Sequence, residues 1–322
     1  MNALIRFLAA FCIVLSGTSA MAQNYPNKVI RLVVPFAPGG TTDVVARIIA
    51  PALSRNLGQP VIIENKPGAG GVTGTSEVLR STADGYTLAL CTLSTVAANP
   101  AINPATPYGP SDLTAIINIA ESATMIAVNP NFPAKAYKDF IAELKSKPSK
   151  YSYGSSGMGG ISHLQMEQFK SLAGVFVTHI PYRGAAPALL DTVSGQIELV
   201  MDATPSILPF INSGKLRPVV VAAPARLKEL PDTPTFSEVG LPQMNRSSYF
   251  GLIGPKGIPV DIVSKLNAAV RLALEDPAIR QRLEANGASA VGGASDKFAS
   301  EINESFLQLK KVVESQKLTL GQ

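Results

Sequence analysis

Short apolar runs alternate along most of the chain with segments in which apolar residues recur at helical spacing. Each run is rich in Val, Ile and Leu and has the length of a buried strand. An alternation of this kind is typical of α/β folds with mainly parallel sheets. In the first part of the chain we expect strands at Val29–Val34, Val61–Ile63 and Thr87–Leu93.

The helix expected between the first two strands has recognisable ends. Its apolar residues recur every three or four positions from Val44 to Leu57. Thr41 or Thr42 has the side chain of an N-cap, and Gly58 is the residue type that ends helices in a left-handed conformation. We therefore predict a helix that begins at one of the threonines and stops at this glycine.

The alternation restarts after an apolar stretch from Leu113 to Val128, which we interpret as extended segments leading out of a first lobe. In the simplest arrangement the chain then builds a second lobe and returns to the first through another crossing strand. Two crossings make a hinge, and a cleft between lobes is a usual place for a ligand. We predict lobe 1 at residues 23–125 and 241–322, and lobe 2 at residues 126–240. The further expected elements are the strands Tyr151–Gly154, Phe176–Pro181, Glu198–Asp202, Arg217–Ala222 and Ser248–Gly254, and the helices Tyr137–Lys147, Ile161–Ala173, Pro187–Ser194, Ser206–Ser213, Ile262–Glu275 and Lys297–Gln316.

Residues 1–22 have the layout of a secretory signal peptide. Arg6 precedes the apolar run Phe7–Leu15, and small residues then end in Ala20-Met21-Ala22. The run is too short for a membrane anchor, which takes ~20 apolar residues to span a bilayer. We expect cleavage after Ala22 and a location in the periplasm.

Composition argues against several classes of protein. The formal net charge of +5 is modest, and no basic block is interleaved with aromatic residues, so we expect no nucleic-acid partner. Cys12 lies in the signal peptide, which leaves Cys91 as one cysteine that cannot form an intrachain disulfide. With two histidines and no HExxH or CxxC motif, we expect no metal site.

Two of the expected strands run into loops of Gly, Pro and Ser that open directly into helices. The loops span residues 36–40 and 155–160, and neither contains Lys or Arg. The first N–H groups of a helix lack partners within it, and the helix dipole places about half a positive charge at that end. A carboxylate or phosphate is favoured there, and glycine allows a close approach to the backbone. The sequence therefore predicts that a small acid is held between two lobes.

Two alternative motifs carry less weight. Residues 68–74 have the spacing G-x-G-G-x-x-G, and no acidic residue closes a following strand, so a tight loop is favoured over a dinucleotide site and no cofactor is expected. Ser155 or Ser156 would be the nucleophile of an exported α/β hydrolase or transferase, but Gly-x-Ser-x-Gly is absent from this stretch. The sequence places neither His163 nor His179 as a base beside these serines. We therefore predict no catalytic residue and keep the hydrolase or transferase as the alternative.

Three charged residues leave their roles open. Arg183 and Asp202 lie at the carboxyl ends of expected strands, where open α/β sheets bind ligands. Arg183 either pairs with an anion or with a neighbouring acid. Asp202 either accepts from an ammonium group, a hydroxyl or a bridging water, or caps the next helix, with capping favoured. Asp43 is expected to be a capping partner on the first helical turn, where an acid complements the dipole.

Several motifs occur in order along the whole mature chain. They are Tyr25-Pro26, Ile30-Arg31-Leu32-Val33-Val34-Pro35-Phe36-Ala37-Pro38-Gly39-Gly40 with Asp43, Glu64-Asn65-Lys66-Pro67-Gly68-Ala69-Gly70-Gly71, Asp84-Gly85-Tyr86-Thr87-Leu88, Tyr153-Gly154-Ser155 with His163-Leu164, and Pro181-Tyr182-Arg183-Gly184. In this combination the chain resembles the substrate-binding receptors of tripartite tricarboxylate transporters, the Bug proteins. The resemblance implies an α/β fold like that of type II periplasmic binding proteins, with two Rossmann-like lobes that close on a small organic acid. It also implies delivery of the acid to membrane permease subunits, and no catalysis.

The resemblance further implies where the ligand lies. Loops from both lobes contact it, and backbone groups reach its carboxylates directly or through water. The family's ligands include mono-, di- and tricarboxylates, acidic amino acids and aromatic acids. The expected ligand-binding residues are Phe36, Ala37, Pro38, Gly39, Gly40, Thr41, Thr92, Ser94, Ser155, Ser156, Gly157, Gly159, Gly160, Arg183, Gly184, Ala185 and Asp202.

Overall fold

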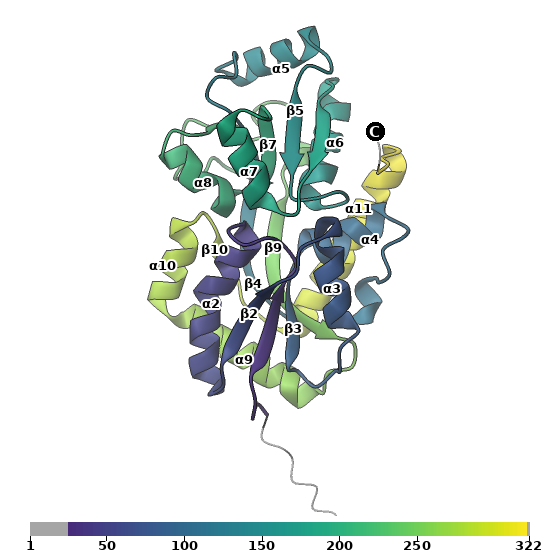
Figure 1. The fold of residues 1–322 in the computed structure, drawn as a ribbon, viewed down its shortest axis with the longest axis vertical. Helices are drawn as coiled ribbons and strands as arrows, with labels where there is room; N and C mark the ends of the chain where they lie inside the picture. Colours follow the sequence, from purple (N-terminus) through teal and green to yellow (C-terminus); the bar gives the residue numbers. More distant parts are fainter. Residues whose placement is uncertain (1–24, 321–322) are drawn as a thin grey trace, which may run out of the picture.

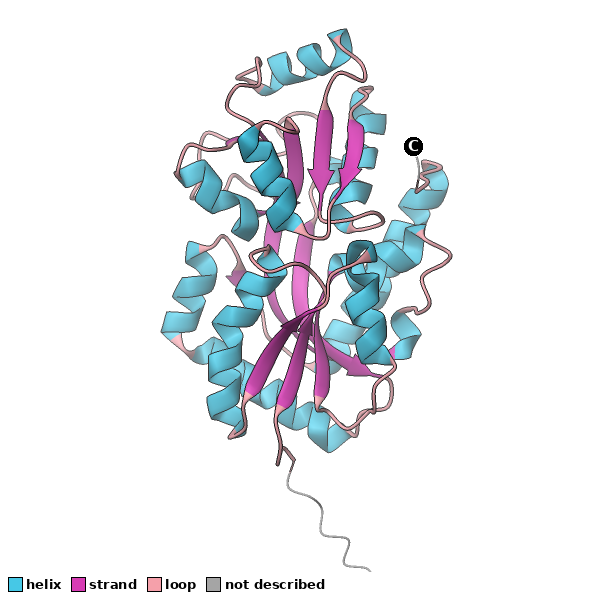
Figure 2. Ribbon diagram, in the orientation of Figure 1, coloured by secondary structure: helices cyan, strands magenta, loops and turns pink. Residues whose placement is uncertain are grey.

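The computed structural model describes residues 25–320, which form two α/β lobes stacked along the long axis of the molecule (Figure 1). In each lobe the strands lie inside and the helices outside (Figure 2). The expected signal peptide, residues 1–22 with its cleavage site after Ala22, lies outside the described residues. Within the described range, no helix combines the length and apolarity needed to cross a membrane.

The sheet of the first lobe has the strand order β2-β1-β3-β9-β4-β10. Strands β1, β2 and β3 are parallel, whereas β9 runs antiparallel to both β3 and β4, and β10 runs antiparallel to β4. The strands are β1 (Ile30–Val34), β2 (Val61–Asn65), β3 (Thr87–Thr92), β9 (Ser247–Pro255) and β10 (Ser289–Ala290).

The sheet of the second lobe has the order β8-β4-β7-β5-β6. Strands β5, β6 and β7 are parallel, and β7 and β8 flank β4 in the antiparallel sense. The strands are β5 (Ser152–Ser155), β6 (Thr178–Pro181), β7 (Leu199–Ala203) and β8 (Arg217–Ala222).

Strand β4 (Leu113–Val128) belongs to both sheets. Its residues up to Ala123 pair with β9, and those from Thr124 onward pair with β7 and β8. The chain returns to the first lobe between η4 (Pro242–Met244) and β9. The expectation of mainly parallel sheets is wrong. Strand β4 leads out of the first lobe and β9 leads back into it, and both run antiparallel to their neighbours, so the sheets are mixed. The lobe limits stated above remain a prediction.

Helices cover both faces of each sheet, so each sheet packs against one cluster of buried apolar side chains on either side. Helix α10 was not predicted from the sequence; it begins after Asp276, whose side chain accepts a hydrogen bond of 2.9 Å from Ala278 N–H. The helices are α2 (Thr41–Leu57), α3 (Val72–Leu79), α4 (Asn99–Ile102), α5 (Tyr137–Ser146), α6 (Ile161–Ala173), α7 (Ala185–Ser194), α8 (Thr204–Asn212), α9 (Val260–Glu275), α10 (Pro277–Ala285) and α11 (Ser295–Ser315), with short turns η1 (Ala69–Gly71), η2 (Ser94–Ala98) and η3 (Pro110–Asp112).

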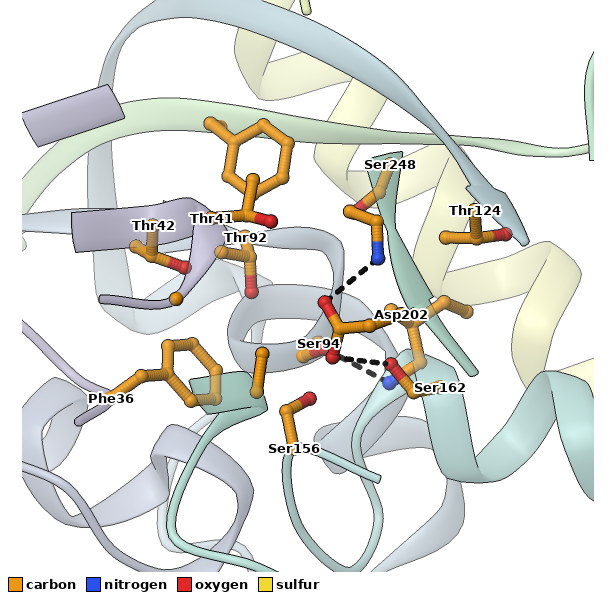
Figure 3. Close-up of a pocket in the computed structure, with 15 residues that line it drawn as sticks. Phe36, Thr41, Thr42, Thr92, Ser94, Thr124, Ser156, Ser162, Asp202 and Ser248 are labelled. Atoms are coloured by element: carbon orange, nitrogen blue, oxygen red, sulfur yellow. Dashed lines mark hydrogen bonds between the residues drawn. The ribbon is translucent and has the colours of Figure 1, made fainter. Parts of the chain in front are cut away.

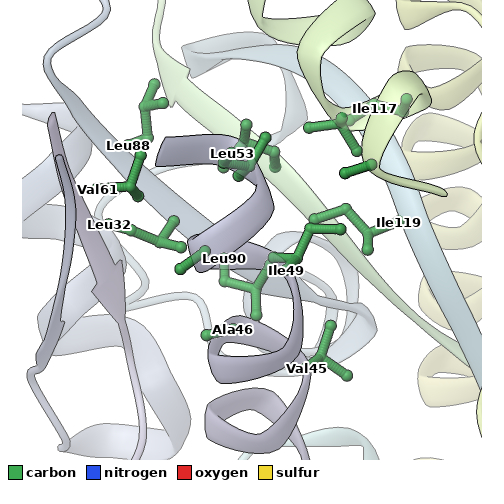
Figure 4. Close-up of a cluster of buried hydrophobic side chains, with 14 of the residues drawn as sticks. Leu32, Val45, Ala46, Ile49, Leu53, Val61, Leu88, Leu90, Ile117 and Ile119 are labelled. Carbon is green, nitrogen blue, oxygen red and sulfur yellow. The ribbon is translucent and has the colours of Figure 1, made fainter. Parts of the chain in front are cut away.

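Helix α2 is anchored across the first sheet by its buried face. Val45, Ile49 and Leu53 lie in one cluster with Leu32 and Leu90 of the sheet (Figure 4). Full burial of a side chain of this size contributes about 1.5–3 kcal/mol. The cluster therefore fixes the position of α2 and of its N-terminus at the edge of the lobe.

The two ends of α2 differ in how well they were predicted. Gly58 ends the helix in the left-handed conformation, with φ of 68°, as expected. The N-cap is Gly40 instead of Thr41 or Thr42, and it supplies no side-chain acceptor. The prediction of a threonine cap is wrong, because both threonines already lie inside the first turn.

Candidate functional site

A cavity lies between the two lobes, and the first residues of both α2 and α6 reach it (Figure 3). It contains about 400 Å³ of space not filled by atoms, including its opening to solvent. The lining is mostly small and hydroxyl side chains, with two phenylalanines and one carboxylate. The lining residues are Phe36, Gly40, Thr41, Thr42, Thr92, Ser94, Ser248 and Phe250 on the side of the first lobe, and Thr124, Ser156, Ile161, Ser162, Ala185, Asp202 and Ala203 on the side of the second.

The start of α2 presents unused hydrogen-bond donors to the cavity. The N–H of Val44 donates to Gly40 at 3.0 Å, so the N–H groups of Thr41 and Thr42 precede the first helical hydrogen bond. The hydroxyls of Thr41 and Thr92 are buried and have no partner within the described residues. A buried polar group without a partner costs about 1–3 kcal/mol. These donors therefore mark a place where an acceptor group of a ligand would be stabilised.

Hydrogen bonds join the two lobes at the start of α6 and between the loops that precede α2 and α7. Ile161 N–H donates to Ser94 Oγ at 2.9 Å, and Ala37 N–H donates to the carbonyl of Arg183 at 3.2 Å. Both hydrogen bonds connect the two lobes beside the cavity. The structure therefore has the lobes in contact at the rim of the site.

Glycines bring the lobes close enough to make these contacts. A Cβ atom on Gly157 would lie 2.7 Å from the Cα of Gly70, and one on Gly184 would lie 2.9 Å from Ala37 N. Real Cβ atoms essentially never come this close to backbone atoms. Side chains at these two positions would therefore hold the lobes apart.

Most of the loop N–H groups that were predicted to bind an anion donate hydrogen bonds to other groups of the protein instead. Gly39 N–H donates to the Asp43 carboxylate at 3.0 Å, and Gly157 N–H donates to Ser155 Oγ at 3.2 Å. Gly159 N–H donates to His163 Nδ1, also at 3.2 Å. The donors that face the cavity are therefore helical N–H groups and hydroxyls.

Asp43 is neutralised within the first lobe instead of facing the ligand. Its carboxylate accepts from Arg47 Nε at 2.8 Å and from Asn65 Nδ2 at 3.0 Å, in addition to Gly39 N–H. Burial alone would raise the pKa of Asp43, but these hydrogen bonds outweigh burial and hold the pKa below its ordinary value. Because Asp43 stays paired and does not line the cavity, it does not oppose the binding of an anion.

Asp202 lines the cavity with its carboxylate at the end of β7. It accepts a hydrogen bond of 2.7 Å from Ala203 N–H, and Ala203 is the N-cap of α8. The expectation that Asp202 caps this helix is wrong, because the residue lies one position before the cap and binds none of the first helical N–H groups. Burial raises the pKa of Asp202 to about 6.

A base lies beside Ser155, contrary to the expectation from sequence. His179 Nε2 is 2.7 Å from Ser155 Oγ, because both side chains point to the same face of adjacent parallel strands. The ring of His179 stacks between those of His163 and Tyr153, and burial lowers the pKa of His179 to about 3. Ser155 is fully buried and does not line the cavity, so this pair stabilises the loop and cannot reach a substrate there.

The structure brings eight of the predicted site residues to the cavity and places nine outside its lining. Arg183 is exposed and forms no ion pair with another described residue. The residues at the cavity are Phe36, Gly40, Thr41, Thr92, Ser94, Ser156, Ala185 and Asp202, and those outside its lining are Ala37, Pro38, Gly39, Ser155, Gly157, Gly159, Gly160, Arg183 and Gly184.

Sequence reasoning missed the cavity residues contributed by the crossing strands. Thr124 comes from β4, and Ser248 and Phe250 come from β9. No local motif marks them, since only the pairing of the crossing strands brings them to the site. Ile161 and Ser162 follow directly after the second glycine-rich loop and could have been included from the helix argument.

Residues 68–71 form a tight turn that leads into α3, in agreement with the tight loop favoured from the sequence. A Cβ on Gly74 would lie 2.6 Å from Lys66 O, and one on Gly71 would lie 2.6 Å from the Thr95 side chain. The glycines therefore permit close packing of α3 on the sheet. Across the described part of the chain, no group of three His, Cys, Asp or Glu side chains is arranged to hold a metal ion.

The chain matches the family model described as the tripartite tricarboxylate transporter family receptor over residues 45–318. It is also similar to the protein BugT of Bordetella pertussis, with 34% identity over 294 residues that cover 91% of this chain and 90% of BugT. The match extends over most of both proteins.

Solved structures show the same fold. A structure described as a periplasmic transporter is 47% identical, with a TM-score of 0.90, and the match covers 92% of this chain and 99% of that one. The R. palustris protein Rpa4515 with adipate is 33% identical, with a TM-score of 0.88 and coverage of 92% and 99%. MatC of Rhodopseudomonas palustris with bound malate is 34% identical, with a TM-score of 0.87 and coverage of 90% and 100%. The predicted α/β fold of a two-lobed periplasmic binding protein is confirmed.

Proposed function

Because the chain belongs to the receptor family of tripartite tricarboxylate transporters, we propose that it holds a small organic acid by a carboxylate group in the cavity between its lobes. The observation that carries this proposal is a pair of buried, unpartnered hydroxyls at the cavity, that of Thr41 at the start of α2 and that of Thr92 at the end of β3. A carboxylate accepts hydrogen bonds only, so it matches both hydroxyls and the adjacent helical N–H groups. The α2 dipole favours the same charge.

The proposed ligand class agrees with what similar proteins hold. Malate and adipate, bound in two of the similar structures, are both small dicarboxylic acids. No Lys or Arg lines the cavity in the described part of this chain. We therefore assign recognition of the carboxylate to hydroxyls and helical N–H groups, and propose the eight predicted residues at the cavity as its binding residues.

The location and partners follow from the same proposal. We place the mature protein in the periplasm after cleavage behind Ala22. Its closed form would deliver the acid to the membrane subunits of the transporter. The protein would release that acid unchanged, as a receptor and not an enzyme does.

Isothermal titration calorimetry tests the proposed function. The protein would be titrated with malate, adipate, succinate, citrate, aspartate and benzoate, and with the diamide of succinate as a neutral control. We expect at least one acid to bind with one molecule per chain and to be recovered unchanged, and the diamide not to bind. Failure of every acid, or conversion of the bound acid, would contradict the proposal.

Replacement of Arg183 by Gln should change the affinity for the acid by less than about fivefold. The side chain is exposed and lies outside the cavity lining, so its charge acts on the ligand through solvent. An exposed ion pair contributes about 0.2–1 kcal/mol, which sets this limit. Calorimetric titration of Arg183→Gln measures the change, and a loss of more than tenfold would show that the guanidinium binds the carboxylate.

A further inference from the structure

Asp202 is the one titratable side chain among the described residues that line the cavity. It is 6% exposed, at the end of β7. The site that binds an acid therefore contains a buried acid of its own. An acceptor-only carboxylate here needs donors, and an anionic ligand alone brings none.

The protein supplies few donors to this carboxylate. Ala203 N–H donates to Oδ1 at 2.7 Å, which is a good hydrogen bond. Ser206 Oγ lies 3.3 Å from the same oxygen, but its single proton has a better acceptor in the Ala203 carbonyl at 2.9 Å. Ser162 Oγ lies 3.4 Å from Oδ2, which is at the long limit of a hydrogen bond, and the hydroxyl of Ser156, which also lines the cavity, is a further donor near the carboxylate. Oδ2 therefore has unused capacity to accept.

No cation offsets the charge. Asp202 forms no ion pair with any described residue, and the groups around it from α8 and α6 are an amide and hydroxyls. Burial raises the pKa of Asp202 to about 6, and the nearby amide and hydroxyls counter this effect only in part. A further donor on the cavity side would therefore stabilise this carboxylate.

We propose that Asp202 selects acids that also carry a hydrogen-bond donor, a hydroxyl or an ammonium group, on the carbon skeleton. The inference rests on the proposed carboxylate-binding function and narrows its ligand class. The carboxylate is held at Thr41 and Thr92, while the donor satisfies Oδ2 of Asp202 on the side of the second lobe. An acid without such a donor leaves the buried Asp202 charge unpaired when the lobes close.

Matched acids that differ by one substituent test this inference. The trios are propionate, lactate and alanine; succinate, malate and aspartate; and glutarate, 2-hydroxyglutarate and glutamate. In the trio whose length fits, the hydroxy or amino acid should bind the wild-type protein at least about tenfold more tightly than the unsubstituted acid, which corresponds to one hydrogen bond to a charged group. Comparison of the hydroxy and amino members shows which donor is preferred.

The variant Asp202→Asn keeps the shape and removes the charge. In Asp202→Asn the ratio of affinities between substituted and unsubstituted acid should fall to below about three. Ser206→Ala is the control, since Ser206 touches the same carboxylate but does not line the cavity, and it should leave the ratio unchanged. The ratio is informative even where a variant is less stable, because both acids are measured on the same protein.

Two results would overturn the inference. Equal affinity of the unsubstituted and substituted acids in the wild type would exclude selection, although the proposed function would stand. An equal loss of affinity for the substituted and the unsubstituted acid in Asp202→Asn would show that Asp202 only supports the fold. Absence of binding by all the acids would instead remove the proposed function, and this inference with it.

Discussion

The Gly157→Ala protein should bind its acid about 10- to 100-fold more weakly than the wild type. Gly157 lies in the second lobe, and a Cβ there would lie 2.7 Å from the Cα and 2.8 Å from the N of Gly70 in the first lobe. Overpacking of this kind costs about 1–3 kcal/mol, and the interlobe part of that cost arises only when the lobes are closed. The substitution therefore opposes closure specifically, beyond any local strain at φ of 137°.

Gly174→Ala is the matched control for this effect. Gly174 is another left-handed glycine of the second lobe, with φ of 63°, and a Cβ there would meet nothing within 4 Å. Both variants should melt somewhat lower, but only Gly157→Ala should lose affinity in calorimetry and contraction on binding in small-angle scattering. Wild-type affinity in a folded Gly157→Ala protein would show that the contact with Gly70 is not part of the bound state.

The second large effect is expected when Thr41 and Thr92 are both replaced by Val. Each change removes a buried hydroxyl that has no partner among the described residues and that faces the cavity. A hydrogen bond to a charged group contributes about 1.5–3 kcal/mol, so each single variant should lose roughly 10- to 100-fold in affinity and the double variant more. The melting temperature of the ligand-free protein should not fall, because no hydrogen bond of the free protein is lost.

Thr192→Val serves as the control for the threonine variants. Thr192 is fully buried in α7, outside the cavity lining, and its hydroxyl donates to Ala188 O at 2.8 Å. This variant should lose a little stability and keep its affinity. The opposite result, in which Thr41→Val and Thr92→Val melt lower but bind normally, would place the carboxylate elsewhere.

The sequence was informative where the structure depends on local order. Strand, loop and helix follow one another at β1 and α2, so the approximate start of the helix and the position of Thr41 near it could be predicted from the order of the residues, although the capping residue could not. Thr92 and Ser94, at the carboxyl end of β3, were expected at the site from the family resemblance, and both line the cavity.

The sequence was uninformative where the pairing of strands that lie far apart in the chain decides which way a side chain points. Ser155 and Ser156 are neighbours, yet Ser155 lies beside His179 while Ser156 lines the cavity. Ser155 is the last residue of β5 and Ser156 is the first residue of the following loop, and only the position of β5 in the sheet shows which of them faces the cavity. Ser248 was hidden for the same reason, since it reaches the site through the antiparallel pairing of β9 with β4.

The most direct test of the central claim is a crystal structure of the protein with the acid that calorimetry finds to bind most tightly. We predict one carboxylate between the lobes, with its oxygens about 2.7–3.2 Å from the hydroxyls of Thr41 and Thr92 and from the first N–H groups of α2. A carboxylate held by Arg183 outside the cavity, or a complex in which both threonine hydroxyls still lack a partner, would contradict the account.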